Sequence, residues 1–264
     1  MGWGLARVAV LFAVSGCLCA QSDPLIEQAR QFARDYSRNL PDYVVTRDTL
    51  RYVGVMPALS GIAAAGNWRV LDEISGELTV RNGVERYGNV REGGKPIAGI
   101  PPGVWSTGEF ASDLMAALAP ERHAKLKAGR SESLRNRQVK RYSFAVNRRN
   151  SNWILSAKNI PGSRDLPASA CGYEGAIWID LATGKILRVQ MSTKDIPLES
   201  PLTGVISQTD YDFTDIDGTQ YVLPAHAEST SCEKRTGLCF RNVSEFRGYR
   251  KFSVNSDLTF EGGH

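Results

Sequence analysis

Hydrophobic residues recur at helical spacing near the start of the chain and at every second position over most of the rest. Asp23-Pro24 supply an N-cap and a first-turn proline, and an apolar stripe then continues until Leu40-Pro41. Its members are Leu25, Ile26, Ala29, Phe32, Ala33 and Tyr36. This spacing predicts an amphipathic helix over residues 24–39.

A second helical pattern runs from Glu109 to Leu118, with Phe110 and Leu114 on its apolar stripe. The segment before it, Gly93–Gly108, is rich in glycine and proline and therefore predicts a loop. Gly54–Gly66 is rich in small residues and predicts a loop or an inserted segment for the same reason. We therefore expect only two clear helices.

From Tyr43 to the C-terminus the dominant period is two, which is typical of β-strands. Asn82-Gly83 is a turn dipeptide that hairpins favour. The alternating runs cover residues 43–52, 69–81, 84–91, 139–146, 153–158, 172–181, 186–195, 206–216, 221–232 and 239–252. The last five have short connections, which predicts one large antiparallel sheet.

Such a sheet must cover its apolar face, because each large side chain left in water forfeits about 1.5 to 3 kcal/mol. We therefore expect an α+β fold in which a large curved antiparallel β-sheet, a half-barrel, wraps around one or two helices. Any uncovered remainder would form an apolar cleft between sheet and helices that suits a hydrophobic ligand. The alternative is that side-chain packing fills this space completely.

The candidate ligand contacts are the inward-facing aromatic and aliphatic residues of these predicted elements. They are Phe110, Leu114, Tyr142, Phe144, Trp178, Leu187, Met191, Tyr211 and Phe213. Each of them is either a wall of the cleft or an ordinary core residue.

The first twenty residues differ from the rest of the chain. Arg7 is their single positive charge, an apolar run follows from Val8 to Val14, and small residues end at Ala20. This pattern is typical of a secretory signal peptide and is shorter than a membrane span of about 20 apolar residues. Cleavage after Ala20 predicts a soluble exported protein, most simply in the periplasm. The alternative is lipidation of Cys17 in the lipobox-like Val14-Ser15-Gly16-Cys17, which would anchor the protein to a membrane.

Length and charge limit the classes of protein further. We expect residues 21–264 to form one domain, since about 240 residues is an ordinary length for a single β-rich core. The formal charge of +4 falls to +3 when Arg7 leaves with the leader, which argues against general nucleic-acid binding. The basic stretch Arg130–Arg149 is interpreted as the solvated face and turn of a hairpin rather than as an anion site.

Three cysteines lie beyond the leader. Cys232 and Cys239 enclose a short loop with Thr236-Gly237 as its turn, which predicts a disulfide across a β-hairpin in an oxidising compartment. Cys171 is left over, and it is either buried or paired with a partner chain.

No recognised catalytic motif is present, whether a nucleophile elbow, a zinc-binding helix, a phosphate loop or a dinucleotide fingerprint. His226 lacks an identifiable nucleophile and is interpreted as an ordinary strand residue rather than a base. Four aspartates suggest calcium, but their spacing fits a strand with solvated aspartates and with Tyr211 and Phe213 inward. They are Asp210, Asp212, Asp215 and Asp217. We expect no metal, no cofactor and no enzymatic activity, with a hydrolase of unrecognised site as the remaining alternative.

One segment resembles a known superfamily. Gly175–Arg188 reads strand, turn and strand, with Trp178, Asp180 and Thr183-Gly184 in the pattern apolar-Trp-apolar-Asp-x-x-Thr-Gly. This pattern is similar to that of the bacterial lipoprotein-carrier-like superfamily, which includes LolA, LolB, LppX, LprG and the regulator RseB. The order of an N-terminal helix followed by a half-open antiparallel sheet is similar as well.

Three further segments resemble a group of uncharacterised exported bacterial proteins over nearly the whole mature chain. They are 39–44, 107–110 and 246–252. That group often has a cysteine where this chain has Val45, and its absence would leave Cys171 unpaired. The resemblance to carriers implies a binding protein of the cell envelope that holds a lipid or an acylated protein. The resemblance to RseB implies the alternative of an envelope-sensing or scaffolding module with a filled core.

Overall fold

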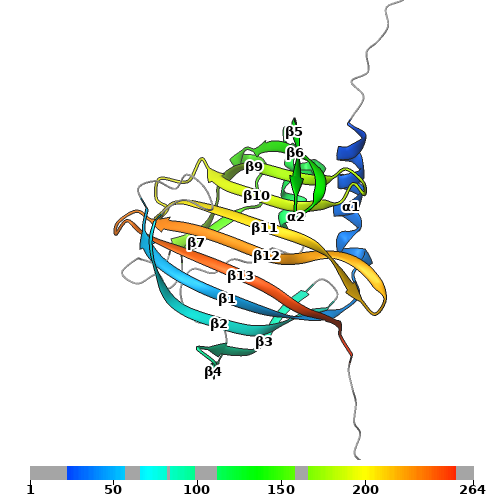
Figure 1. Ribbon diagram of the computed structural model, residues 1–264. Helices are drawn as coiled ribbons and strands as arrows, with labels where there is room; N and C mark the ends of the chain where they lie inside the picture. The colour runs from blue at the N-terminus through cyan, green and yellow to red at the C-terminus, as the bar shows by residue number, and fades with distance from the viewer. Residues whose placement is uncertain (1–22, 57–65, 82–83, 99–111, 158–165, 254–264) are drawn as a thin grey trace, which may run out of the picture.

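The computed structural model describes residues 23–56, 66–81, 84–98, 112–157 and 166–253. Eleven antiparallel strands form one sheet in the order β4-β3-β2-β1-β13-β12-β11-β10-β9-β6-β5 (Figure 1). Its edge strands, β4 and β5, lie at opposite ends of this order, so the sheet is open. A separate two-stranded sheet pairs β7 with β8.

The strands have the following bounds. They are β1 (Tyr43–Val55), β2 (Asn67–Arg81), β3 (Val84–Glu92), β4 (Lys95–Pro96), β5 (Lys127–Leu134), β6 (Arg137–Val146), β7 (Ile154–Ala157), β8 (Leu166–Ala170), β9 (Gly172–Asp180), β10 (Ile186–Lys194), β11 (Leu202–Ile216), β12 (Thr219–Glu233) and β13 (Leu238–Lys251). Two α-helices, α1 (Pro24–Asn39) and α2 (Ser112–Leu118), and two 3-10 turns, Pro120–Arg122 and Arg148–Asn150, complete the fold.

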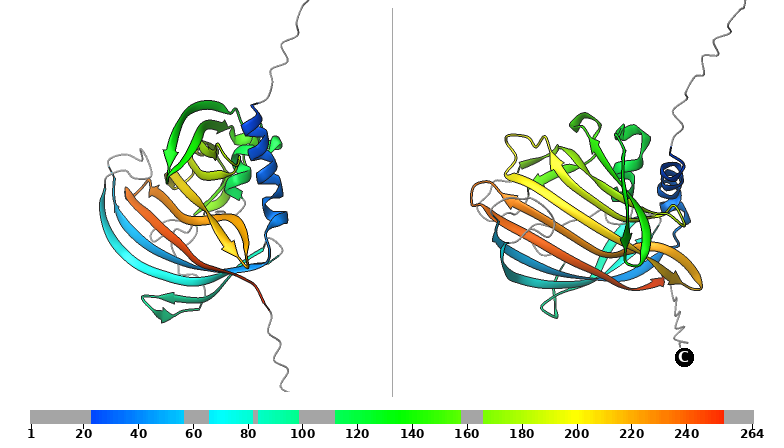
Figure 2. Two further views of the ribbon diagram at one scale, coloured as in Figure 1. Left: turned by 45° about the vertical axis from the view of Figure 1, so that its right-hand side comes forward. Right: turned by 45° about the horizontal axis from the view of Figure 1, so that its top comes forward.

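Both helices lie on one side of the sheet, toward the inside of its curve (Figure 2). Asp23 caps α1 by accepting a hydrogen bond from the Leu25 amide at 3.1 Å. The other carboxylate oxygen of Asp23 accepts from the Tyr142 hydroxyl on β6 at 2.6 Å, so the cap also joins the helix to the sheet. In α2, the Asp113 carboxylate accepts from the Thr209 hydroxyl on β11 at 2.8 Å.

The expected α+β fold with a large curved antiparallel sheet around two helices is confirmed. Helix α1 has the predicted bounds, whereas α2 is described only from Ser112 onward. Three strands were not predicted. Strand β5 has the sequence KAGRSESL, which offers almost no apolar alternation, β8 has the short sequence LPASA, and the two-residue β4 lies in the segment expected to be a loop. Gly93-Gly94, expected in a loop, form a positive-φ turn between β3 and β4.

The predicted disulfide between Cys232 and Cys239 is present, with a Cα–Cα distance of 4.0 Å. The two cysteines are directly opposite each other at the ends of β12 and β13. Cys171 is fully buried, and burial raises the pKa of its thiol to about 11. The interpretation of Cys171 as a buried residue is therefore confirmed.

Replacing both Cys232 and Cys239 with serine is expected to lower the free energy of unfolding by about 2 kcal/mol, because the closed loop is short. Urea unfolding at equilibrium measures this difference. Addition of dithiothreitol to the unmodified chain should reproduce it, and should leave the double variant unchanged. Equal stability of the unmodified chain and the double variant, both measured without reducing agent, would show that the disulfide does not restrain this hairpin.

Candidate functional site

The sheet has two faces of different character, which the strand register defines. Tyr142 and Thr209 contact the two helices and lie in one cross-strand row with Ile177 and Val189. We call this the helix-facing face. Because successive side chains of a strand point to opposite sides, Arg141 belongs to the other side, the outer face.

Most of the predicted ligand contacts lie together in the main hydrophobic core. Six of them are buried there: Leu114, Tyr142, Phe144, Leu187, Met191 and Tyr211. Phe213 is partly buried against the same core, between the cationic groups of Arg137 and Lys185 at 4.4 and 5.2 Å from its ring centre. Phe110 lies outside the described residues.

Trp178 is buried but differs from its expected inward orientation. It alternates with Ile177 and Ile179 and is paired across the sheet with Arg141 and Arg188, on the outer face. Both guanidinium groups lie against the indole ring, at 5.4 and 5.7 Å from its centre. Its indole N–H donates to the Glu132 carboxylate on the edge strand β5.

A buried polar surface on the helix-facing face was not predicted from the sequence. One row of residues that pair from strand to strand crosses β6, β9, β10, β11, β12, β13, β1 and β2. This row is apolar at its β6 end and polar at its β2 end. In order, its residues are Phe144, Gly175, Met191, Ser207, Ser229, Asn242, Arg51 and Asp72. An amphipathic ligand would match such a row.

The polar end of the row contains a buried ion pair. The Arg51 Nε donates to Asp72 Oδ1 at 2.6 Å, and the two side chains are only 6% and 14% exposed. Arg47, four positions away on the same face, is also buried. Its guanidinium donates to the Tyr87 hydroxyl at 2.6 Å and to the Ser244 hydroxyl at 3.1 Å.

Three successive hydroxyls of β12, those of Ser229, Thr230 and Ser231, are buried and have no hydrogen-bond partner within the described part of the chain. Ser229 is 6% exposed and Ser231 is 1% exposed, and the Oγ atom of each is unpaired. Leaving a buried polar group unpaired costs about 1 to 3 kcal/mol. Ser229 and Ser231 are on the helix-facing side, because they lie two and four positions from Ala227, which pairs with Thr209, whereas Thr230 points to the outer face.

The outer face carries a ladder of charged pairs. Arg188 forms a bidentate ion pair with Asp210, with one N–O distance of 2.7 Å. The expectation that Asp210 is solvated is therefore wrong, since this residue is buried opposite Arg188 beside a β-bulge. Asp212, Asp215 and Asp217 are exposed, as expected.

His226 belongs to this ladder. Its two ring nitrogens lie 2.7 Å from a Glu245 oxygen and 3.2 Å from a Glu228 oxygen. Hydrogen bonding to Glu228 and then to Glu245 raises the pKa of His226 to about 9, so the imidazole is protonated at neutral pH. A protonated ring cannot accept a proton, and this argues against His226 as a general base.

The charged form of His226 should make stability depend on pH. Because its folded pKa of about 9 exceeds the ordinary value of 6.5, its contribution is complete below pH 6.5 and disappears as the pH rises through 9. We expect the free energy of unfolding to fall by about 2 kcal/mol over this range. Denaturant titrations at pH 6, 7.5 and 9.5 measure the change, and His226→Gln should abolish it. A wild-type slope that persists in His226→Gln would assign the effect to other groups.

Other kinds of site find no support in the described residues. No group of three histidine, cysteine or acidic side chains there is arranged to hold a metal ion. None of the helices described is both long and apolar enough to cross a membrane.

No protein-family model matches the chain, and no curated protein sequence matches it. Among solved structures, it is similar to a putative outer membrane lipoprotein-sorting protein domain from Vibrio parahaemolyticus, with 13% identity and a TM-score of 0.36. This alignment covers 85% of this chain and 91% of that chain. A LolA superfamily protein from Nitrosomonas europaea has 10% identity and a TM-score of 0.30, with coverages of 88% and 93%.

The lipoprotein LppX of Mycobacterium tuberculosis is a third match, with 12% identity and a TM-score of 0.28, over 89% of this chain and 100% of that chain. At TM-scores of this size, the likeness says nothing about the ligand of this chain.

Proposed function

We propose that this protein is an exported, non-enzymatic binding protein of the cell envelope that holds a lipid or an acylated protein between its sheet and its helices. The observation that carries the proposal is that the buried hydroxyls of Ser229 and Ser231 on the helix-facing face have no partner among the described residues. Native proteins leave few buried polar groups unpaired, so a bound polar group is a physical reason for these two.

The cross-strand row suggests how such a ligand would lie. Phe144 and Met191 are 3% and 6% exposed and supply apolar surface at one end. Ser229 and Asn242, which face each other on β12 and β13, supply polar groups further along. An acyl chain would lie against the first pair and its polar head against the second.

Entry of an acyl chain would require α2 to move, because α2 packs over this apolar end. Leu114 of α2 is fully buried in the same core as Phe144 and Met191. Among the described residues, hydrogen bonds from Thr209 to Asp113 and from Tyr173 to the Ala116 carbonyl hold this helix to the sheet, and they would have to break or move with it.

Export to an oxidising compartment is supported by the leader-like first twenty residues and by the Cys232–Cys239 disulfide. We propose the periplasm as this compartment. Lipidation of Cys17 is the alternative, in which the protein is attached to a membrane through its N-terminus.

One observation favours a second candidate function. Six predicted ligand contacts are buried in one core, which is what an envelope-sensing or scaffolding module with a filled interior would show. Uptake of a fluorescent fatty acid by delipidated protein separates the two functions. Saturable uptake supports the binding protein, whereas a filled core takes up none.

Mass spectrometry of the protein purified from its own envelope tests the proposal. Under native conditions we expect additional mass that organic extraction removes and that the extract contains as a lipid. The denatured spectrum also shows whether the chain begins at Gln21 or carries an acylated Cys17. Native mass equal to the mass of the bare chain, together with no fatty-acid uptake, would contradict the proposed function.

A further inference from the structure

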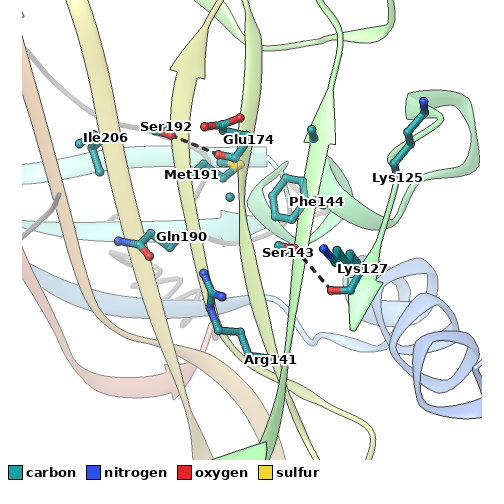
Figure 3. A pocket seen from close by; sticks show the side chains of 12 residues that line it. Lys125, Lys127, Arg141, Ser143, Phe144, Glu174, Gln190, Met191, Ser192 and Ile206 are labelled. Atoms are coloured by element: carbon teal, nitrogen blue, oxygen red, sulfur yellow. Dashed lines mark hydrogen bonds between the residues drawn. The ribbon is translucent and has the colours of Figure 1, made fainter. Parts of the chain in front are cut away.

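A groove of about 610 Å³ opens on the outer face, on the side of the sheet away from the proposed lipid site (Figure 3). Its base consists of strands β6, β9 and β10, and β5 forms one wall. A volume of this size suits a small molecule or a single headgroup. The residues that line it are Lys125, Lys127, Arg141, Ser143, Phe144, Ala145, Glu174, Gly175, Gln190, Met191, Ser192 and Ile206.

The base is low because Ser143 and Ala145 on β6 carry short outward side chains. Behind them, β9 and β10 approach each other closely at Gly175, where a Cβ atom would come within 1.9 Å of the Gln190 carbonyl oxygen. A ligand in the groove would therefore reach the sheet backbone.

One wall of the groove is cationic. Lys127 is directly opposite Ser143, the Lys125 amide donates to the Ala145 carbonyl, and Arg141 precedes Ser143 by two positions on the same face. Within the described residues, these three cations form no ion pair with a carboxylate. The groove's own acid, Glu174, is paired in the register with Ala145 and lies 3.7 Å from Lys194, which offsets its charge.

The Arg141 side chain is preorganised to bind an anion. Its guanidinium lies against the Trp178 ring, and Trp178 is itself held by its hydrogen bond to Glu132. A guanidinium held in this way loses little freedom when it binds two oxygens of one anion. It is half-buried, whereas Lys125 and Lys127 are exposed and can close over a bound group.

We infer that this groove binds a phosphate group carried by a small molecule or a lipid headgroup. A phosphate monoester offers up to two negative charges and several acceptor oxygens, which matches three cations on one wall better than a single carboxylate does. Gln190 and Ser192 supply further polar groups, and Ile206 supplies an apolar margin for the rest of the ligand. The groove opens on the opposite face of the sheet from the proposed lipid site, although Phe144 and Met191 of that site also line it.

Isothermal titration of the mature chain with glycerol 3-phosphate tests this inference, with inorganic phosphate and uncharged glycerol as parallel titrants. We expect saturable binding of glycerol 3-phosphate and none of glycerol. Lys125→Gln/Lys127→Gln should weaken the binding by about tenfold or more, because each charged hydrogen bond contributes strongly. The control Lys95→Gln/Lys251→Gln makes the same change in net charge on exposed strands away from the groove and should alter binding less than about twofold.

Arg141→Lys keeps the charge but loses the planar group, and should also weaken binding while circular dichroism stays unchanged. Co-sedimentation with vesicles that contain phosphatidic acid, whose headgroup is a phosphate monoester, identifies the source of the phosphate. Vesicle binding that is lost in the groove variant indicates a membrane headgroup, and binding of the soluble phosphates alone indicates a free metabolite. No binding of either soluble phosphate or of vesicles, or equal loss in the groove and control variants, would overturn the inference. Neither of these outcomes depends on fatty-acid uptake, so a failure of this inference is distinguishable from a failure of the proposed function.

Discussion

Replacing Asp72 with alanine is expected to lower the free energy of unfolding by about 3 to 5 kcal/mol, because it removes the carboxylate from a buried ion pair. Arg51 and Asp72 are only 6% and 14% exposed, so water does not replace the lost partner well. Chemical denaturation followed by circular dichroism measures the loss. It should be the largest of any single charged residue considered in this protein.

Two control variants separate this effect from a general effect of charge. Arg51→Met/Asp72→Leu removes both charges and should recover most of the stability, since apolar pairs of similar volume often replace buried ion pairs without loss. Arg38→Ala breaks a surface pair with Asp35 at 3.9 Å and should change stability by less than about 0.5 kcal/mol. An effect of Asp72→Ala as small as that of Arg38→Ala would show that the helix-facing face is hydrated.

The Ser229→Ala/Ser231→Ala double variant should affect binding and stability in opposite directions. Each substitution removes a buried hydroxyl that has no partner among the described residues, so the empty protein should be as stable as the original or more stable by about 1 to 2 kcal/mol. The same hydroxyls are the proposed partners of the ligand head. Affinity for an acyl ligand should therefore fall by about 10- to 100-fold, as expected for the loss of two hydrogen bonds.

The control for this variant is Ser133→Ala, on the exposed part of β5, which should change neither quantity. Displacement of a fluorescent fatty acid measures affinity, and urea unfolding of delipidated protein measures stability. Reduced stability in the double variant, with unchanged affinity, would mean that Ser229 and Ser231 serve the core and not a ligand.

Local signals explain what could be predicted from the sequence. Helix α1 has its cap, its proline and its stripe within one segment, and the structure reproduces its bounds. The disulfide hairpin was predictable because its turn and both cysteines lie within eight residues. The pairing of β1 with β13 was not predicted, since Thr49 and Ser244 are separated by nearly the whole domain and no local pattern relates them.

The candidate site was harder to predict, for two physical reasons. Strand β9 is buried on both faces over Ala176–Asp180, so alternation could not show that Trp178 faces outward. Ser229, Ser231 and Asn242 are small polar residues at alternate strand positions, a pattern that normally indicates a solvated face. Their burial depends on the curvature of the sheet, which the sequence pattern does not report.

Photo-crosslinking with a fatty acid that carries a diazirine near the end of its chain tests the central claim most directly. After irradiation and proteolysis, we expect labelled peptides from β6 and β10, around Phe144 and Met191, and loss of labelling in the presence of excess unlabelled fatty acid. Placing the diazirine near the carboxylate should move the label to β12 and β13, around Ser229 and Asn242. Labels confined to outer-face residues, or labelling that excess fatty acid does not prevent, would contradict binding between the sheet and the helices.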